Sequence, residues 1–290
     1  MNPLLEQRLQ SHVNKLALDI GERNVYRPTA LHAAADYIRT TWQQLGYEVH
    51  TQGYYAKGVW SENLEIEITG STSPGEIILA GAHYDSVTGS PGADDNASGI
   101  AALLEIARLL SGSQPARTLR LVAFVNEEPP FFYFGAMGSK IYAQAARARN
   151  DDIRMMLSLE MLGYYSDQPG SQAYPPCLRW FYPDHGNFIG FVSNLKSRQA
   201  LKKFARAFAA RSDFPFETLT SPAFVPGVAW SDQISFWHAG YQAIMVTDTA
   251  FYRNPHYHRA SDTPEKLSYT PMARVVDGLA NALATLVKAQ

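Results

Sequence analysis

The chain has 290 residues, which is enough for one large α/β domain or two small ones. A hydrophobic fraction of 46%, with 12% aromatic residues, can build a sizeable core, so a disordered chain is excluded. The formal net charge is −2 and the sequence carries no basic stripe, which argues against nucleic acid as a partner.

Cysteine content and the N-terminus narrow the class further. Cys177 is the one cysteine, so no disulfide can form within the chain, and we expect an inert, half-buried thiol. The N-terminus carries charge early and lacks the apolar segment of a signal peptide. No run approaches the ~18 apolar residues of a membrane span. We therefore expect a cytoplasmic protein with no membrane partner.

Hydrophobic periodicity divides the chain into alternating helices and strands. Apolar residues at helical spacing predict the helices, and apolar runs or period-two alternation predict the strands. In chain order we expect a helix at 4–18, a helix at 31–45 closed by Gly46, strands at 63–69 and 76–82, a helix at 97–110, a strand at 119–125, a helix at 136–148, strands at 153–161 and 187–192, a helix at 198–211, a strand at 242–247, and a closing helix at 271–288 with Pro271 at its first position.

This order predicts the architecture. The alternation in residues 63–69 indicates a strand with one wet face near the sheet edge, whereas the continuous apolar run 76–82 indicates burial on both faces. Strands that alternate with helices predict an α/β fold, a single domain over residues 1–290 with a mainly parallel, mixed β-sheet flanked by helices. The segment 163–187, rich in proline, tyrosine and glycine, is either an inserted loop near the site or a surface excursion.

Side chains with metal-binding chemistry stand at the ends of three of these strands. His83 and Asp85 end one strand, Glu127 and Glu128 a second, and Glu160 a third. Because the carboxyl ends of parallel strands meet at one edge of a sheet, we expect these groups to converge. Carboxylates brought together in this way repel one another unless cations neutralise them. Asp85 is placed to accept the second imidazole N–H of its neighbour His83.

Two further motifs supply candidate ligands. Asp94 and Asp95 precede a helix, so one can cap that helix while the other binds metal, and a carboxylate can bridge two cations. A C-terminal loop offers His256 and His258. Adjacent residues in a strand point in opposite directions, so one glutamate of the 127–128 pair can bind metal while the other acts as a base. This inventory suits two divalent metals and a general base, which is the equipment for metal-assisted hydrolysis.

Taken together, the motifs resemble peptidase family M28, zinc peptidases that include bacterial aminopeptidases with a co-catalytic metal pair. The resemblance extends from the first helices to Tyr269. It rests on these blocks: Gly81-Ala-His83-Tyr-Asp85-Ser, Gly92-Ala-Asp-Asp95-Asn-Ala-Ser-Gly99, Asn126-Glu127-Glu128, Glu160-Met-Leu-Gly, Ser231-Asp232 with Phe236, and His258-Arg-Ala-Ser-Asp262-Thr.

The resemblance implies a zinc-dependent exopeptidase-like fold with two divalent metal ions, and Zn²⁺ is the metal that we expect. It implies these roles: His83 and Glu160 on one zinc, Glu128 and His258 on the other, Asp95 as the bridge, Glu127 as the general base, and Asp85 as the residue that orients His83. Some positions depart from the family pattern. Glu160 stands where many members have aspartate, and Gln233 stands where a histidine is frequent. Val228 lies near the position of a tyrosine that in some aminopeptidases helps to stabilise the tetrahedral intermediate.

The implied activity is hydrolysis of peptide bonds by an aminopeptidase that acts on peptides or amino-acid amides with a free N-terminus. The aromatic residues 131–134, with Tyr164 and Tyr165, predict a partly apolar substrate pocket or, equally, core packing. Two alternatives belong to other classes: an acyl transfer of the glutaminyl cyclase type with one zinc, and a non-catalytic binding domain of the same fold. The intact ligand set favours the peptidase over both.

Overall fold

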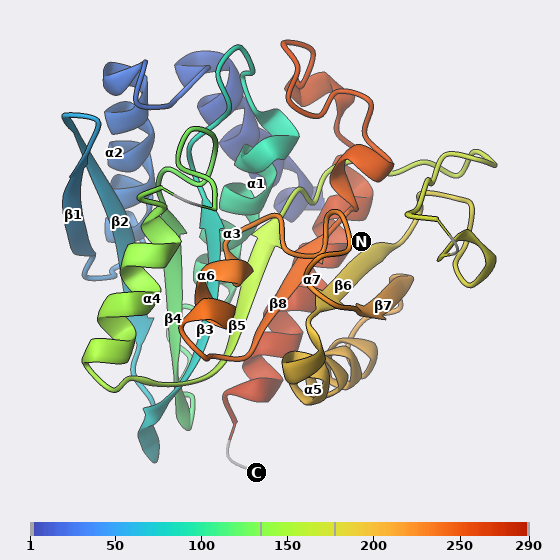
Figure 1. Cartoon of the computed structure of the whole chain (residues 1–290). Helices are drawn as coiled ribbons and strands as arrows, with labels where there is room; N and C mark the ends of the chain where they lie inside the picture. The colour runs from blue at the N-terminus through green and yellow to red at the C-terminus, as the bar shows by residue number, and fades with distance from the viewer. Residues whose placement is uncertain (1–2, 134, 177, 289–290) are drawn as a thin grey trace.

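The computed structural model describes residues 3–133, 135–176 and 178–288. Its strands are β1 (His50–Ala56), β2 (Val59–Ile68), β3 (Ser73–His83), β4 (Arg117–Phe124), β5 (Asp152–Glu160), β6 (Ile189–Ser193), β7 (Phe216–Thr220) and β8 (Ala243–Thr247). They form one sheet in the order β1-β2-β4-β3-β5-β8-β6-β7 (Figure 1). Parallel pairing joins β4, β3, β5 and β8 in the centre, and β6 with β7 at one edge. Antiparallel pairs join β1 to β2, β2 to β4 and β6 to β8. The predicted mainly parallel, mixed sheet is thereby confirmed.

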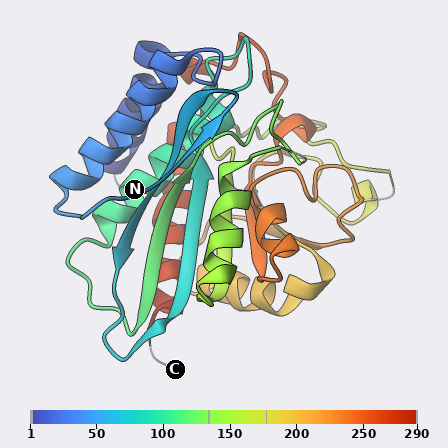
Figure 2. The ribbon, with the colours of Figure 1, turned by 60° about the vertical axis from the view of Figure 1, so that its left-hand side comes forward.

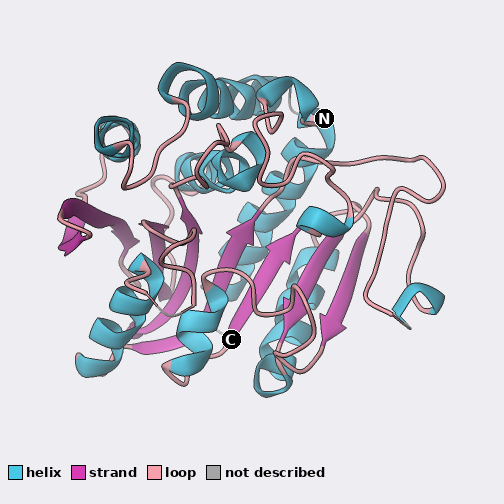
Figure 3. Cartoon of the chain, turned by 45° about the horizontal axis from the view of Figure 1, so that its top comes forward, coloured by secondary structure: helices cyan, strands magenta, loops and turns pink. Residues whose placement is uncertain are grey.

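Helices cover both faces of this sheet (Figures 2 and 3). They are α1 (Pro3–Asn14), α2 (Pro28–Gln44), α3 (Gly99–Leu109), α4 (Gly138–Ala148), α5 (Arg198–Ala209), α6 (Gln233–His238) and α7 (Tyr269–Leu286). The helices α4 and α6 pack on one face with Leu79 and Met156 of the sheet. The other five contribute to a larger core on the opposite face, where they meet Leu157 and Phe191. We call the face under α4 and α6 the front face.

Local sequence explains the principal elements. The β3 residues from Ile77 to His83 are all buried, as expected for a strand with helices on both sides. Helix α2 has Pro28 at its start, where a missing N–H costs nothing, and Gly46 follows it with a φ of +87°. In α3 every residue from Gly99 to Ala107 is buried, because the helix packs among α1, α2 and α7 as well as the sheet.

The structure differs from the prediction in several elements. The edge strands β1 and β7 and the short helix α6 were not predicted, because their residues are partly exposed or too few to show a period. Helix α7 begins at Tyr269, so Pro271 is not its first residue, although it still lies in the first turn, where proline is tolerated. The first predicted helix divides into α1 and a π-helical turn, Lys15–Ile20.

Of regular structure, the described residues of the segment 163–187 contain a short 3₁₀ turn, Leu178–Trp180, and one bridge between Ser166 and Gly186. It extends as loops beyond β6 in Figure 1. Cys177 and Phe134 lie outside the described residues, so the expected burial of that thiol stays a prediction. Among the helices that the structure describes, none combines the length and apolar character needed to cross a bilayer.

Candidate metal centre

The predicted site residues meet at the carboxyl ends of the central strands. His83 is the last residue of β3 and Glu160 the last residue of β5. Glu127 and Glu128 were expected to end the strand β4. They stand instead in the loop that follows its last residue, Phe124. The parallel arrangement of these strands brings all three ends to one edge of the sheet.

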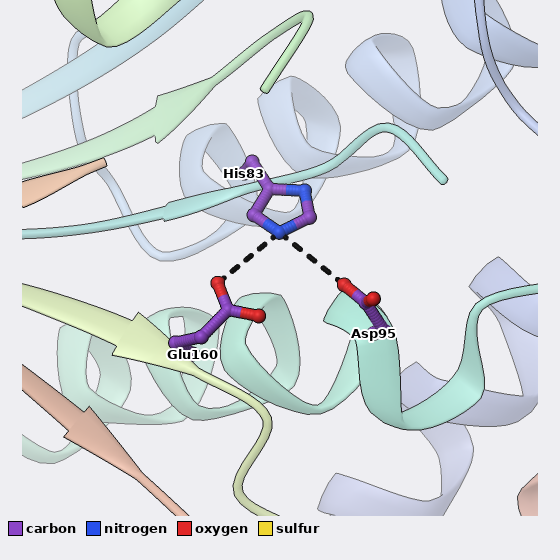
Figure 4. Close-up of side chains that lie close together, drawn as sticks. All are labelled: His83, Asp95 and Glu160. Atoms are coloured by element: carbon purple, nitrogen blue, oxygen red, sulfur yellow. Dashed lines mark ion pairs between the residues drawn. The ribbon is translucent and has the colours of Figure 1, made fainter. Parts of the chain in front are cut away.

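One group of potential ligands consists of His83, Asp95 and Glu160 (Figure 4). The Nε2 atom of His83 lies 3.4 Å from Oδ1 of Asp95 and 3.3 Å from Oε2 of Glu160. Asp95 reaches this position from an irregular turn, Ala93–Ser98, that precedes α3. The Asn96 side chain ties this turn to β5, because it donates to the Leu159 carbonyl and accepts the Met161 N–H.

A second group consists of Asp95, Glu128 and His258. The Nε2 atom of His258 lies 3.2 Å from Oδ2 of Asp95 and 3.2 Å from Oε2 of Glu128. Asp95 thus presents one carboxylate oxygen to each histidine, and a single side chain joins the two groups. The neighbouring His256 takes no part, since its Nδ1 lies 2.9 Å from the Ser261 hydroxyl.

The His83 ring tests whether these residues suit a metal ion. Its Nδ1 lies 3.2 Å from the Asp85 carbonyl, which fixes the proton on that nitrogen. Its Nε2 is buried and has no hydrogen-bond partner among the described residues, although two carboxylates face it. Ligands of a tetrahedral zinc ion, at about 2.0–2.1 Å from the metal, stand roughly 3.3 Å apart. The distances in both groups match this spacing, so the residues fit zinc.

The charges of the site support the same conclusion. Burial would lower the pKa of His83, but the facing carboxylates of Glu160, Asp85 and Asp95 raise it well above its ordinary value. Burial raises the pKa of Glu128 to about 7, with the Asp95 charge adding to the effect. Burial also raises the pKa of Glu160. Buried carboxylates that destabilise one another's ionised form are the expected environment for divalent cations.

Two aspartates hold the site loops through pairs of backbone amides. The Asp85 carboxylate accepts the N–H groups of Glu127 and Glu128, each at 3.1 Å, and lies 3.5 Å from the His83 ring. In the same manner, Asp262 accepts the N–H groups of Asp94, at 2.9 Å, and Asp95, at 3.1 Å. Asp85 therefore fixes the glutamate loop as well as standing beside His83. The role of Asp262 was missed, although the Asp262-Thr263 pair was part of the recognised motif.

Asp94 does not join either ligand group. Its carboxylate accepts the Gly163 N–H at 2.8 Å and the Asn254 side-chain amide at 2.7 Å. Burial raises its pKa well above the ordinary value, and Asp248, close by, adds to the effect. Of the Asp94-Asp95 pair, the second thus faces the histidines while the first links three loops behind the site.

Glu127 stands beside both groups without belonging to either. Its Oε2 lies 4.0 Å from Nε2 of His83. Burial raises its pKa well above the ordinary value; the His83 charge opposes this shift, and Glu128 adds to it. A buried carboxylate next to, but outside, a ligand group is suited to exchange protons with a water molecule there.

Further contacts at the site were not predicted from the sequence. The Ser231 hydroxyl donates to Oε2 of Glu160 at 2.6 Å, which fixes the longer arm of this glutamate. The Tyr257 ring stacks on the His258 imidazole with centroids 3.8 Å apart. Burial raises the pKa of Tyr257, and the Asp95, Glu128, Glu160 and Glu127 carboxylates raise it further, so its hydroxyl stays protonated in reach of their field. The Gln233 side chain donates to the Val228 carbonyl at 3.1 Å and does not enter either group.

A cavity opens beside Glu160 on the front face. Strands β6, β7 and β8 form its floor, and the 163–187 segment contributes Tyr174, Leu178 and Tyr182 to its wall. Its other aromatic residues are Phe188, Phe191, Trp230, Phe251, Tyr252 and Tyr257. The described residues of the aromatic stretch, 131–133, do not line this cavity: Phe131 is buried in the core of the opposite face. The 163–187 segment therefore contributes to this cavity, and its role as an insertion at the site stays a prediction.

Comparisons with known proteins point to one family. The model of "Peptidase family M28" matches residues 63–283. An uncharacterized protein of Escherichia coli K12, YfbL, is 38% identical over 96% of this chain and 87% of its own length. A probable aminopeptidase of Saccharomyces cerevisiae, YDR415C, is 27% identical over 74% of this chain, and the chain spans 54% of that protein.

Solved structures share the fold. A zinc aminopeptidase from Bacillus subtilis superposes with a TM-score of 0.78 and 15% identity, covering 98% of this chain and 95% of that one. A glutaminyl cyclase from Fimbriiglobus ruber superposes with a TM-score of 0.70 and 17% identity, covering 98% and 96%. At these identities the likeness establishes the fold alone, and the chemistry has to be argued from the site.

Proposed function

The chain belongs to peptidase family M28, and on this premise we propose that it is a zinc-dependent aminopeptidase that removes residues from the N-terminus of peptides. The observation that carries the proposal is the carboxylate of Asp95, which faces one imidazole with each oxygen and so joins two ligand groups. We further propose that residues 1–290 form one peptidase domain, because the single sheet runs through the described chain from β1 to β8.

The proposed ligand roles follow the two groups. His83 and Glu160 would hold one zinc ion, Glu128 and His258 the other, and Asp95 both. Ions in these positions supply Lewis acidity, which acidifies water and polarises a peptide carbonyl. The family implies zinc; the presence of two ions is part of the proposal.

The residues around the ions have separate tasks. Glu127, buried beside His83, accepts a proton from the attacking water and delivers it to the leaving amine. The hydroxyl of Tyr257, held by the stack on His258, donates a hydrogen bond to the oxygen on which charge develops. Asp85 and Ser231 keep the glutamates in position.

The ability of the site to anchor a free amino group is the reason that we propose an aminopeptidase. An ammonium or neutral amine finds an electron-rich anchor among the carboxylates of the site, whereas an acetylated N-terminus has no charge and keeps a single N–H donor. The first side chain of the peptide would then lie in the cavity beside Glu160. The cytoplasmic location expected from the sequence stays a prediction.

A comparison of free and blocked substrates tests the proposal. We expect zinc-loaded enzyme to cleave leucine p-nitroanilide and a leucyl peptide. N-acetylation should lower kcat/KM by at least ~10²-fold, the cost of about 3 kcal/mol of transition-state stabilisation. Equal cleavage of free and acetylated peptides, or cleavage at internal bonds, would refute the aminopeptidase assignment.

The glutaminyl cyclase alternative is supported by the shared fold. It predicts one metal ion per chain and a cyclised product from a peptide with N-terminal glutamine, with no residue released. Metal analysis of the purified protein and mass spectrometry of that reaction separate the two activities. Two bound ions together with release of free amino acids would exclude the cyclase.

A further inference from the structure

One carboxylate lies in the cavity beside Glu160 without any task in the proposed chemistry. Glu217, in the edge strand β7, lines the cavity among residues that are mainly apolar or aromatic. No hydrogen bond or ion pair to its carboxylate occurs within the part of the chain that the structure describes. Burial raises its pKa above the ordinary value, so the group is partly withdrawn from water.

The register of the sheet places Glu217 in line with the metal centre. Glu160 pairs with Thr247, Thr247 with Gly190, and Gly190 with Glu217, so these residues form one row across β5, β8, β6 and β7. Residues that pair directly across strands point to the same side of a sheet. All four line the cavity, so the row faces it, although Glu160, Gly190 and Thr247 are themselves buried.

The length of this row fits a long side chain. Neighbouring strands are about 4.8 Å apart, so the Cα atoms of Glu160 and Glu217 are separated by roughly 14 Å. Between them Gly190 contributes no side chain to the floor of the cavity, and the side chains of Thr247 and Thr249 lie within van der Waals distance of the place that its Cβ would take. A substrate whose N-terminus is anchored at the metal centre can thus extend its first side chain over Thr247 and Gly190 towards Glu217.

The walls of the cavity suit the stem of such a side chain. Tyr174 and Tyr182 stand near Glu217, since its charge contributes to raising the pKa of both phenols. Phe251 and Tyr252 supply further aromatic faces. Methylene groups pack against these rings, and a cation at their end is attracted both by the rings and by the carboxylate.

From this arrangement we infer that Glu217 selects substrates whose N-terminal residue is lysine or arginine. The inference rests on the proposed aminopeptidase function and names its substrate class. A neutral side chain of the same length would exclude water from Glu217 without offering a partner, which is unfavourable for a charged group. An ammonium or guanidinium group instead forms a charge-assisted hydrogen bond with it.

Isosteric substrates test the inference. Norleucine has the carbon chain of lysine without its amine, and citrulline is the neutral counterpart of arginine. With zinc-loaded enzyme we expect kcat/KM for lysyl p-nitroanilide to exceed that for norleucyl p-nitroanilide by about tenfold or more. The same order should hold for arginyl over citrullyl p-nitroanilide.

Substitution of the carboxylate assigns the preference to this residue. Glu217→Gln should bring the lysyl-to-norleucyl ratio close to one, because it lowers lysyl turnover and relieves the penalty on norleucyl turnover, while the zinc content stays unchanged. The matched control Glu48→Gln, which removes the same charge from an exposed position, should keep the wild-type ratio. A wild-type ratio near one, or a ratio unaffected by Glu217→Gln, overturns the inference.

A binding measurement separates this inference from the proposed function. Calorimetry with free lysine and norleucine on the zinc-loaded protein should show tighter binding of lysine, again lost in Glu217→Gln. If none of the anilides is cleaved, the aminopeptidase assignment fails. The ratio of the lysine and norleucine affinities measured by calorimetry then decides alone whether Glu217 selects a cationic side chain. If norleucyl substrate is cleaved and lysine has no advantage in either assay, the assignment stands and the selectivity is refuted.

Discussion

Asp262 offers a quantitative test of how the chain holds the bridging carboxylate. This residue is fully buried, and its two oxygens accept the N–H groups of Asp94 and Asp95 at 2.9 and 3.1 Å. Burial raises the pKa of Asp262 to about 7, with the Asp94 charge adding to the effect, so the carboxylate is ionised above that pH. There, each bond to the charged acceptor contributes about 1.5–3 kcal/mol. In Asp262→Asn the remaining oxygen keeps one neutral bond of about 0.5–1.5 kcal/mol, while the new NH₂ group faces an amide donor.

The difference between these terms gives a loss of about 3 kcal/mol in the free energy of unfolding. Because the Asp95 backbone is no longer fixed, we also expect zinc affinity to fall by about 10–100-fold. Urea unfolding of the metal-free protein measures the first effect, and competition with a chromogenic chelator measures the second. The control is Asp36→Asn, the same change on the exposed face of α2, for which both quantities should stay at the wild-type value.

The reasoning is refuted if Asp262→Asn unfolds at the wild-type urea concentration and binds zinc equally well. Loss of stability with unchanged zinc affinity would show that Asp95 keeps its place without the hydrogen bonds to the Asp262 carboxylate. In that case the link between the turn Ala93–Ser98 and β5 made by Asn96 would be sufficient to orient the bridge.

The remaining predictions concern the reacting groups. Glu127→Gln should lower kcat by ~10²–10⁴-fold while the protein retains its zinc. Glu128→Gln should lose zinc, since Glu128 belongs to a ligand group and Glu127 does not. Zinc loss in Glu127→Gln but not in Glu128→Gln would mean that the two roles are exchanged. Tyr257→Phe keeps the ring stacked on His258 but removes the hydroxyl, so kcat should fall by ~10²-fold at nearly constant KM and zinc content. A raised KM with unchanged kcat would show that the tyrosine serves substrate binding only.

Much of the fold could be predicted from the sequence because the central elements are strongly patterned. The strands β3, β4 and β5 are apolar runs buried on both faces, and α2 and α5 show regular helical spacing. The edge strand β7 could not be predicted: its side chains are all half-buried or exposed, and five residues give too few repeats for an alternation to be recognised. Secondary structure at a sheet edge depends on its neighbour more than on its own composition.

The groups around the metal ligands show a similar division. His83 and Glu160 could be placed at one edge because each ends a strongly patterned strand, and Asp95 because it directly precedes the strongly patterned helix α3. Ser231 and Tyr257 carry no such signal. Each acts through one contact with a residue distant in sequence or adjacent in a loop, the hydroxyl on Glu160 and the ring on His258, and only the folded chain brings these contacts together.

The two halves of the sheet therefore have different tasks. The ligand groups depend on β3 and β5, which end in His83 and Glu160, and on the loops beside them that carry Asp95, Glu128 and His258. The cavity depends on β8, β6 and β7 and on the 163–187 segment. Glu160 is the residue common to both, since it ends β5, belongs to a ligand group and lines the cavity. Substitutions on β6 or β7 can for this reason alter which side chain is accepted while the metal ligands stay in place. Changes at Glu160 or Ser231 must affect both together.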